Sequence, residues 1–174
     1  MDVNLSSITL RPFRLTDLDD FMVWASDDQV THFMRWNTFS SREEALNYIR
    51  DVCIPHPWRR SICLDDRSIG FISVKPASGN DYCRAEVGYA IAFKYWGQGI
   101  ATRALKMALS CVFKDMPYLV RLQALVDIDN KASERVLEKA GFLKEGVLRK
   151  YCLLKSGVKD LAIYSFLSTD SILD

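Results

Sequence analysis

Hydrophobic and polar positions along the chain predict strands interleaved with helices. Apolar runs typical of strands lie at residues 8–13, 58–64, 69–75, 84–92, 119–126, 143–154 and 158–168. Helical spacing of apolar residues is found at about 16–25, 41–52, 99–113 and 130–140. Strands and helices in this order predict an α/β or α+β domain with one central sheet.

Several polar residues and glycines mark the expected ends of these elements. Thr16 is suited to cap the first helix, and Ser41 with Glu44 forms a capping-box pattern for the second. Gly141 suits the left-handed cap at the end of the helix over 130–140. Lys155-Ser156-Gly157 predicts a hairpin turn between the last two strands.

The segment Glu86–Thr102 carries the clearest chemical signal. An apolar strand ends at a turn containing Gly97 and Gly99, and a helix pattern follows at once. A helix start leaves backbone N–H groups without partners and carries partial positive charge, and glycine lets a phosphate approach the backbone. The turn lacks the Lys-Ser/Thr pair of a Walker loop and the last glycine of the dinucleotide fingerprint. It predicts a phosphate-bearing ligand such as a coenzyme, the alternative being a plain strand-to-helix turn.

Composition narrows the class of protein. A chain of 174 residues with 49% hydrophobic content suits one domain spanning 1–174. The net charge of +1, without a basic cluster, argues against direct nucleic-acid binding. No apolar run reaches the roughly 20 residues of a membrane span, and the N-terminal residues lack a secretory pattern. We therefore expect a cytoplasmic protein, possibly also nuclear, that does not bind membranes.

The five cysteines are scattered, and none forms Cys-x-x-Cys. Only two histidines accompany them. We expect free thiols and no metal site.

Two motifs resemble the GNAT superfamily of acetyl-CoA-dependent N-acetyltransferases: YWGQGIAT at Tyr95–Thr102 and NKASERVLEKAGF at Asn130–Phe142. The opening TLRPF at 9–13 and the tail over 145–160 are similar to the branch that acetylates ribosomal-protein N-termini. The resemblance implies a mixed, mostly antiparallel, seven-stranded sheet flanked by about four helices. It also implies that the sheet splays open between its fourth and fifth strands to admit coenzyme A.

The resemblance also implies residues that bind acetyl-CoA. Backbone groups of Tyr89, Ala90 and Ile91 are expected beside the pantetheine arm and the acetyl group. The pyrophosphate is expected on the loop residues Trp96, Gly97, Gln98, Gly99, Ile100, Ala101 and Thr102. Asn130 is expected to contact the pantetheine, although it equally suits an N-cap. Arg103 and Lys106 either approach the phosphates or are solvated helix residues.

Catalytic residues follow less directly from the family pattern. Leu137 occupies the position at which many members carry a tyrosine acid, so that role cannot be transferred. Ser133, one turn earlier, matches a serine that the branch places near the coenzyme sulphur, and a helix-start serine is the alternative. Glu86 shares a strand face with Gly88 and Ala90 and is our candidate general base, acting through water. A structural glutamate is the alternative.

The expected reaction is acetyl transfer to a primary amine, most simply a protein or peptide N-terminus, by direct attack in a ternary complex. The alternatives are a polyamine or aminoglycoside-like acceptor, and a catalytically weak acyl-CoA-binding module. We expect a monomer or a homodimer. Trp36, Tyr48 and Trp58 are expected to border the acceptor entrance, and Phe33 and Phe39 to serve as packing.

Overall fold

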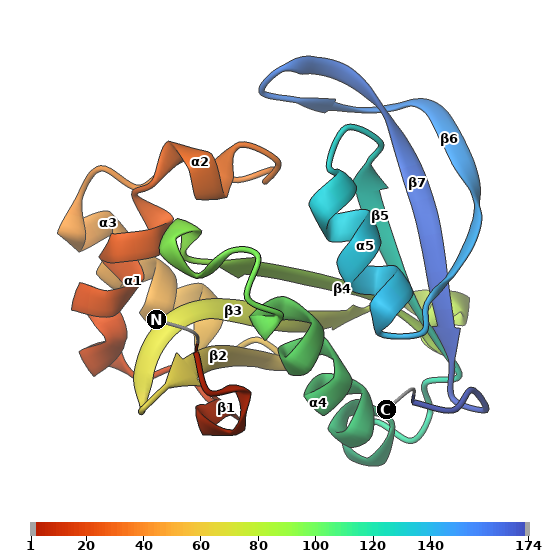
Figure 1. Ribbon diagram of the computed structural model, residues 1–174, viewed down its shortest axis with the longest axis horizontal. Helices are drawn as coiled ribbons and strands as arrows, with labels where there is room; N and C mark the ends of the chain where they lie inside the picture. Colours follow the sequence, from red (N-terminus) through yellow and green to blue (C-terminus); the bar gives the residue numbers. More distant parts are fainter. Residues whose placement is uncertain (1–2, 173–174) are drawn as a thin grey trace.

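A seven-stranded sheet forms the centre of the computed structural model, which describes residues 3–172 (Figure 1). Its strands are β1 (Ile8–Arg11), β2 (Arg59–Leu64), β3 (Arg67–Pro76), β4 (Arg84–Ile91), β5 (Arg121–Asp127), β6 (Leu143–Leu154) and β7 (Gly157–Leu167). They lie in the order β1-β2-β3-β4-β5-β7-β6, and of these neighbouring pairs only β4 and β5 run parallel. The expected mixed, mostly antiparallel sheet is confirmed.

Within residues 3–172, five α-helices cover the two faces of the sheet: α1 (Leu18–Ala25), α2 (Asp28–Thr31), α3 (Arg42–Tyr48), α4 (Ile100–Asp115) and α5 (Lys131–Lys139). About four helices were expected, and α2 is the additional one. It is a single turn of four residues, too short to show a helical period in the sequence. The second expected helix does reach residue 52, but its C-terminal part, Ile49–Cys53, is π-helical.

Each face of the sheet has its own hydrophobic core. Ile72 and Val87 face α4 and α5 and pack with buried aliphatic residues of those helices. On the opposite face, Phe71 packs with Phe21 and Trp24 of α1 in an aromatic cluster. Alternate residues of β3 and β4 thus enter different cores, as strand geometry requires.

The ends of the helices match two of the three capping predictions. Ser41 accepts the Glu44 N–H at 3.3 Å, and Gly141 has φ +94° after α5. There the Gly141 and Phe142 N–H groups bond to the last carbonyls of the helix, as in a Schellman motif. The Thr16 prediction is wrong, because α1 begins after Asp17. The Asp17 carboxylate accepts the Arg14 N–H at 2.8 Å and closes a 3-10 turn that contains Thr16.

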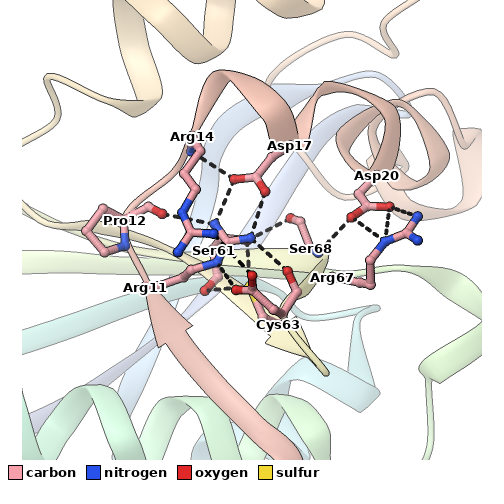
Figure 2. A network of polar contacts seen from close by, with 10 residues as sticks. Arg11, Pro12, Arg14, Asp17, Asp20, Ser61, Cys63, Arg67 and Ser68 are labelled. Carbon is pink, nitrogen blue, oxygen red and sulfur yellow. Dashed lines mark hydrogen bonds and ion pairs between the residues drawn. The ribbon is translucent and has the colours of Figure 1, made fainter.

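A polar network fixes β1 to the β2–β3 hairpin and to the start of α1 (Figure 2). Arg11 donates to both carboxylate oxygens of Asp17, at 2.7 and 2.9 Å, and to Asp66 Oδ1 at 2.7 Å. Asp17 is buried, and Asp66 lies in the hairpin turn with φ +62°. One arginine therefore connects β1 and the nearby start of α1 to a hairpin turn that lies 55 residues away in the sequence.

The sheet opens between β4 and β5. The two strands pair only over Arg84–Glu86 and Arg121–Gln123, whereas β4 stays paired with β3 as far as Ile91. Beyond Glu86 one edge of β4 is therefore free of strand partners. The expected opening between the fourth and fifth strands is confirmed, and it positions the site described below.

The β6–β7 hairpin rises past α5 and curves toward α2 (Figure 1). Its Lys155-Ser156 turn contacts that helix across the opening, where Lys155 Nζ donates to the Thr31 carbonyl oxygen at 3.0 Å. All five cysteines are free thiols, as expected. Over residues 3–172 no helix is both long and apolar enough to cross a membrane, and no three metal-ligating side chains gather.

Candidate active site

A cleft of about 320 Å³ occupies the opening beside β4. Its walls come from the end of β4, the loop to α4, the first turn of α4, the exposed side of α5 and the segment after α2. Most of the predicted coenzyme-binding residues line it: Tyr89, Ala90, Ile91, Trp96, Gly97, Gly99, Ile100, Ala101, Thr102, Asn130 and Ser133. The structure thus brings two distant motifs to one cavity.

The loop before α4 has the backbone of an anion cradle. Gly97 and Gly99 have φ of +76° and +79°, in the left-handed region that favours glycine. Gly99 is the N-cap of α4, and no side chain caps the helix there. A Cβ added at Gly97 would meet nothing within 4 Å. The free N–H groups and open space fit a diphosphate at this helix start.

The free edge of β4 presents backbone groups to the cleft. Ala92 N–H donates to the Ile69 carbonyl of β3 at 2.8 Å. Because the hydrogen-bonded residues alternate along an antiparallel ladder, the backbone N–H and C=O groups of Ala90 also point toward β3. Tyr89 and Ile91 therefore direct their backbone groups into the opening. The Ile91 carbonyl already accepts the Trp96 indole N–H at 2.7 Å, which fixes the start of the loop.

Ser133 and Asn130 lie together at the start of α5. Asn130 Oδ1 accepts the Ser133 N–H at 3.1 Å, so Asn130 is the N-cap of the helix while it also lines the cleft. The Ser133 hydroxyl lies 2.9 Å from the Tyr89 phenol oxygen. Leu137, one turn later, is fully buried in the core. The helix therefore offers a hydroxyl, and not a phenol, to the cleft.

The Tyr89 side chain is a functional group that sequence reasoning missed, because only its backbone was considered. Desolvation by burial is the main cause that raises the pKa of its phenol. A signal was present in the sequence, because Val87 and Tyr89 are two residues apart on a strand and so share a face. This face packs against α4 and α5. The partner hydroxyl on α5 could be found only in the tertiary structure.

Two predicted residues lie outside the cleft lining. Glu86 is exposed at the point where β4 and β5 separate, opposite Lys75 of β3. Its role as a general base stays a prediction. Gln98 lies in the loop, where its Nε2 donates to the Lys94 carbonyl at 3.2 Å while its buried Oε1 has no protein partner.

A second hollow, of about 550 Å³, continues the cleft along α4. The two cavities share Gly99, Thr102 and Lys139. Arg103 and Lys106 line the second one, so these residues do face a cavity. Three cations beside an uncapped helix start form a site for an anion.

The acceptor side of the cleft differs from the sequence prediction. Val30, Phe33 and Met34 line the cavity, so Phe33 is not merely packing. Trp58 is buried and its indole N–H donates to Asp115 of α4 at 2.9 Å, so it cannot border an entrance. Tyr48 belongs to the aromatic core, where the buried Arg59 contacts it.

Among the described residues that line the cleft, the only charged side chains are Arg135 and Lys139. The cleft therefore combines cationic side chains of α5, beside the start of α4, with an apolar lip formed by Val30, Phe33 and Met34. Free strand backbone and a serine hydroxyl lie between them. This layout can hold a long ligand with an anionic end and an acyl group opposite it.

Comparison with known proteins agrees with this layout. The family model for the acetyltransferase (GNAT) domain matches residues 7–143. Relatives include an uncharacterized N-acetyltransferase, YoaA, of Bacillus subtilis, which is 33% identical over 87% of this chain and 89% of its own length. The putative ribosomal N-acetyltransferase YdaF of B. subtilis is 28% identical over 78% of each chain. Spermidine N(1)-acetyltransferase of Escherichia coli is 29% identical over 82% of this chain and 76% of its own.

Solved structures share the fold. A GNAT-family acetyltransferase from Bacillus anthracis has a TM-score of 0.84 at 24% identity and covers 98% of this chain and 100% of its own. Mycobacterium smegmatis RimJ, solved in complex with CoA-disulfide, has a TM-score of 0.76 at 26% identity and covers 92% and 82%. With the family model spanning most of the chain, the protein belongs to the GNAT family of acetyl-CoA-dependent N-acetyltransferases.

Proposed function

We propose that the protein transfers the acetyl group of acetyl-CoA to the α-amino group of a protein or peptide. The observation that carries this proposal is the cleft itself. Its cationic end suits the phosphates, and its lip of Val30, Phe33 and Met34 is apolar. Without a carboxylate among its described lining residues, the cleft lacks the charge that a polyamine would require.

Different residues of the cleft would bind different parts of acetyl-CoA. The N–H groups of the first turn of α4 would hold the pyrophosphate, with Arg103, Lys106 and Lys139 around the remaining phosphate charge. The free backbone edge at Tyr89 and Ile91 would pair with the amide groups of the pantetheine. An N–H group on this edge would also stabilise negative charge that develops on the acetyl carbonyl oxygen.

The chemistry that we propose is direct attack in a ternary complex. The neutral amine forms a bond to the acetyl carbon, the carbon–sulphur bond breaks, and the electron pair remains on sulphur. Ser133 donates a hydrogen bond to the departing thiolate. The amine proton would leave through water, and Glu86, which is exposed, would accept it as the base.

A panel of acceptors tests the proposal. The protein is incubated with acetyl-CoA and either an N-terminal peptide library or a set of polyamines and aminoglycosides, and products are identified by mass spectrometry. We expect acetylated peptide N-termini. Turnover of polyamines alone would favour the small-molecule alternative, for which the similarity to a spermidine acetyltransferase is the supporting observation.

The buried Leu137 keeps a second alternative open, namely a catalytically weak acyl-CoA-binding module. Calorimetry with acetyl-CoA, combined with a thiol-release assay, separates the two. Tight binding without thiol release on any amine would support the module.

A further inference from the structure

Two hydroxyls meet across the opening of the sheet. The Tyr89 phenol oxygen of β4 lies 2.9 Å from Ser133 Oγ and 3.3 Å from the Ser133 carbonyl oxygen on α5. Both residues line the cleft. Ser133 is already held at its backbone, since Asn130 Oδ1 accepts its N–H. The phenol can therefore affect the direction in which the Ser133 hydroxyl points.

The proton count at this contact allows two arrangements. If Ser133 donates to the phenol oxygen, the phenol proton goes to the Ser133 carbonyl and no hydroxyl proton is left for the cleft. If Tyr89 donates to Ser133 Oγ, the serine proton is free to point into the cleft. Only the second arrangement offers a donor to a negatively charged sulphur.

The surroundings of Tyr89 favour a phenol that keeps its proton. Desolvation by burial raises the pKa of the phenol, so it stays neutral at the pH at which an amine acceptor becomes nucleophilic. A donor that does not ionise can polarise the next hydroxyl in a chain of hydrogen bonds. Tyr89 is thus suited to orient Ser133, and poorly suited to deliver its own proton.

We propose that Tyr89 is a positioning residue, whose phenol donates to Ser133 Oγ and so directs the Ser133 proton toward the thiolate of CoA. The role rests on the proposed function, because it needs the coenzyme sulphur beside Ser133. No proton leaves Tyr89 or Ser133. The thiolate is stabilised by the hydrogen bond until it takes a proton from solvent.

The test measures the pKa of the CoA thiol when bound to the full chain, from the pH dependence of thiolate absorbance, so no acceptor is required. The variants are Tyr89→Phe, Ser133→Ala and the double variant. We expect the bound thiol in the wild type to ionise more readily than free CoA. Each single variant should raise its apparent pKa by about one, a tenfold loss of thiolate stabilisation typical of a hydrogen bond to a charged group.

The double variant tests whether Tyr89 acts through Ser133. If Tyr89 acts through Ser133, adding Tyr89→Phe to Ser133→Ala should change nothing further. Tyr164→Phe is the matched control, since it also removes a phenol that is largely shielded in the core, here one bonded to Glu138 at 3.5 Å, and Tyr164 does not line the cleft. This variant should leave the thiol pKa unchanged.

Three results would overturn the inference. They are an unchanged thiol pKa in Tyr89→Phe, an equal effect of Tyr89→Phe with and without Ser133, and an equal shift in Tyr164→Phe. Ser133→Ala tests the same contact from the other side if Tyr89→Phe fails to fold. A wild-type protein that does not bind CoA at all would instead overturn the proposed function, and this inference with it.

Discussion

At the scale of single residues, backbone conformation at Gly97 and Gly99 decides whether the loop can hold an anion. Both glycines adopt left-handed φ values, and both line the cleft. The sequence pointed to this pair because two glycines follow an apolar strand and precede a helix. It did not reveal which donors and cations surround them. Arg103, Lys106 and Lys139 come together only when α4 and α5 pack side by side.

We predict that Gly99→Val raises the Kd for acetyl-CoA at least about tenfold, a loss of about 1.4 kcal/mol. A β-branched residue is strained at φ +79°, and its side chain would stand at a position that lines the cleft. Gly79→Val is the matched control, since Gly79 also has a positive φ, of +61°, but does not line the cleft. Calorimetry measures both. Equal affinity in the two variants would contradict the diphosphate assignment.

At the scale of elements, the Arg11 network joins β1, the start of α1 and the β2–β3 turn (Figure 2). Its central pair is largely buried, with 13% of the Arg11 side chain and 4% of the Asp17 side chain exposed. The pair between Arg14 and Asp66, by contrast, is more than half exposed on both sides. The two arginines therefore differ in burial while they share one carboxylate partner.

We predict that Arg11→Ala lowers the free energy of unfolding by about 3–5 kcal/mol, because it leaves the buried Asp17 charge without its partner. Arg14→Ala, the control, should cost at most about 1 kcal/mol, since its side-chain pair is exposed and its backbone N–H still donates to Asp17. Urea unfolding measures both changes. Similar losses in the two variants would show that burial does not set the strength of this network.

At the scale of the whole molecule, the β6–β7 hairpin and α2 meet over the opening of the sheet (Figure 1). Lys155 and Thr31 are 124 residues apart, and their hydrogen bond of 3.0 Å joins the two sides of the opening, where we propose that the acceptor enters. The family model ends at residue 143, so the hairpin lies beyond the part of the chain that it matches.

We predict that Lys155→Met speeds amide hydrogen exchange in residues 148–160 and around α2, because a methionine keeps the apolar stem but cannot donate to Thr31. The KM for a peptide acceptor should rise severalfold while the Kd for acetyl-CoA stays constant. Lys114→Met, at an exposed position in the last turn of α4, is the control. Unchanged exchange in the Lys155 variant would show that the contact does not hold the hairpin.

The sequence by itself determined the order of strands and helices and the two segments that line the cleft, since these depend on periodicity, glycines and caps within a few neighbouring residues. The Thr16 cap and the role of Trp58 were wrong because carboxylates from other positions, Asp17 and Asp115, formed the decisive hydrogen bonds. The pairing of Tyr89 with Ser133 was decided by tertiary structure alone. It requires β4 and β5 to separate after three paired residues, so that a strand side chain can reach a helix 44 residues away.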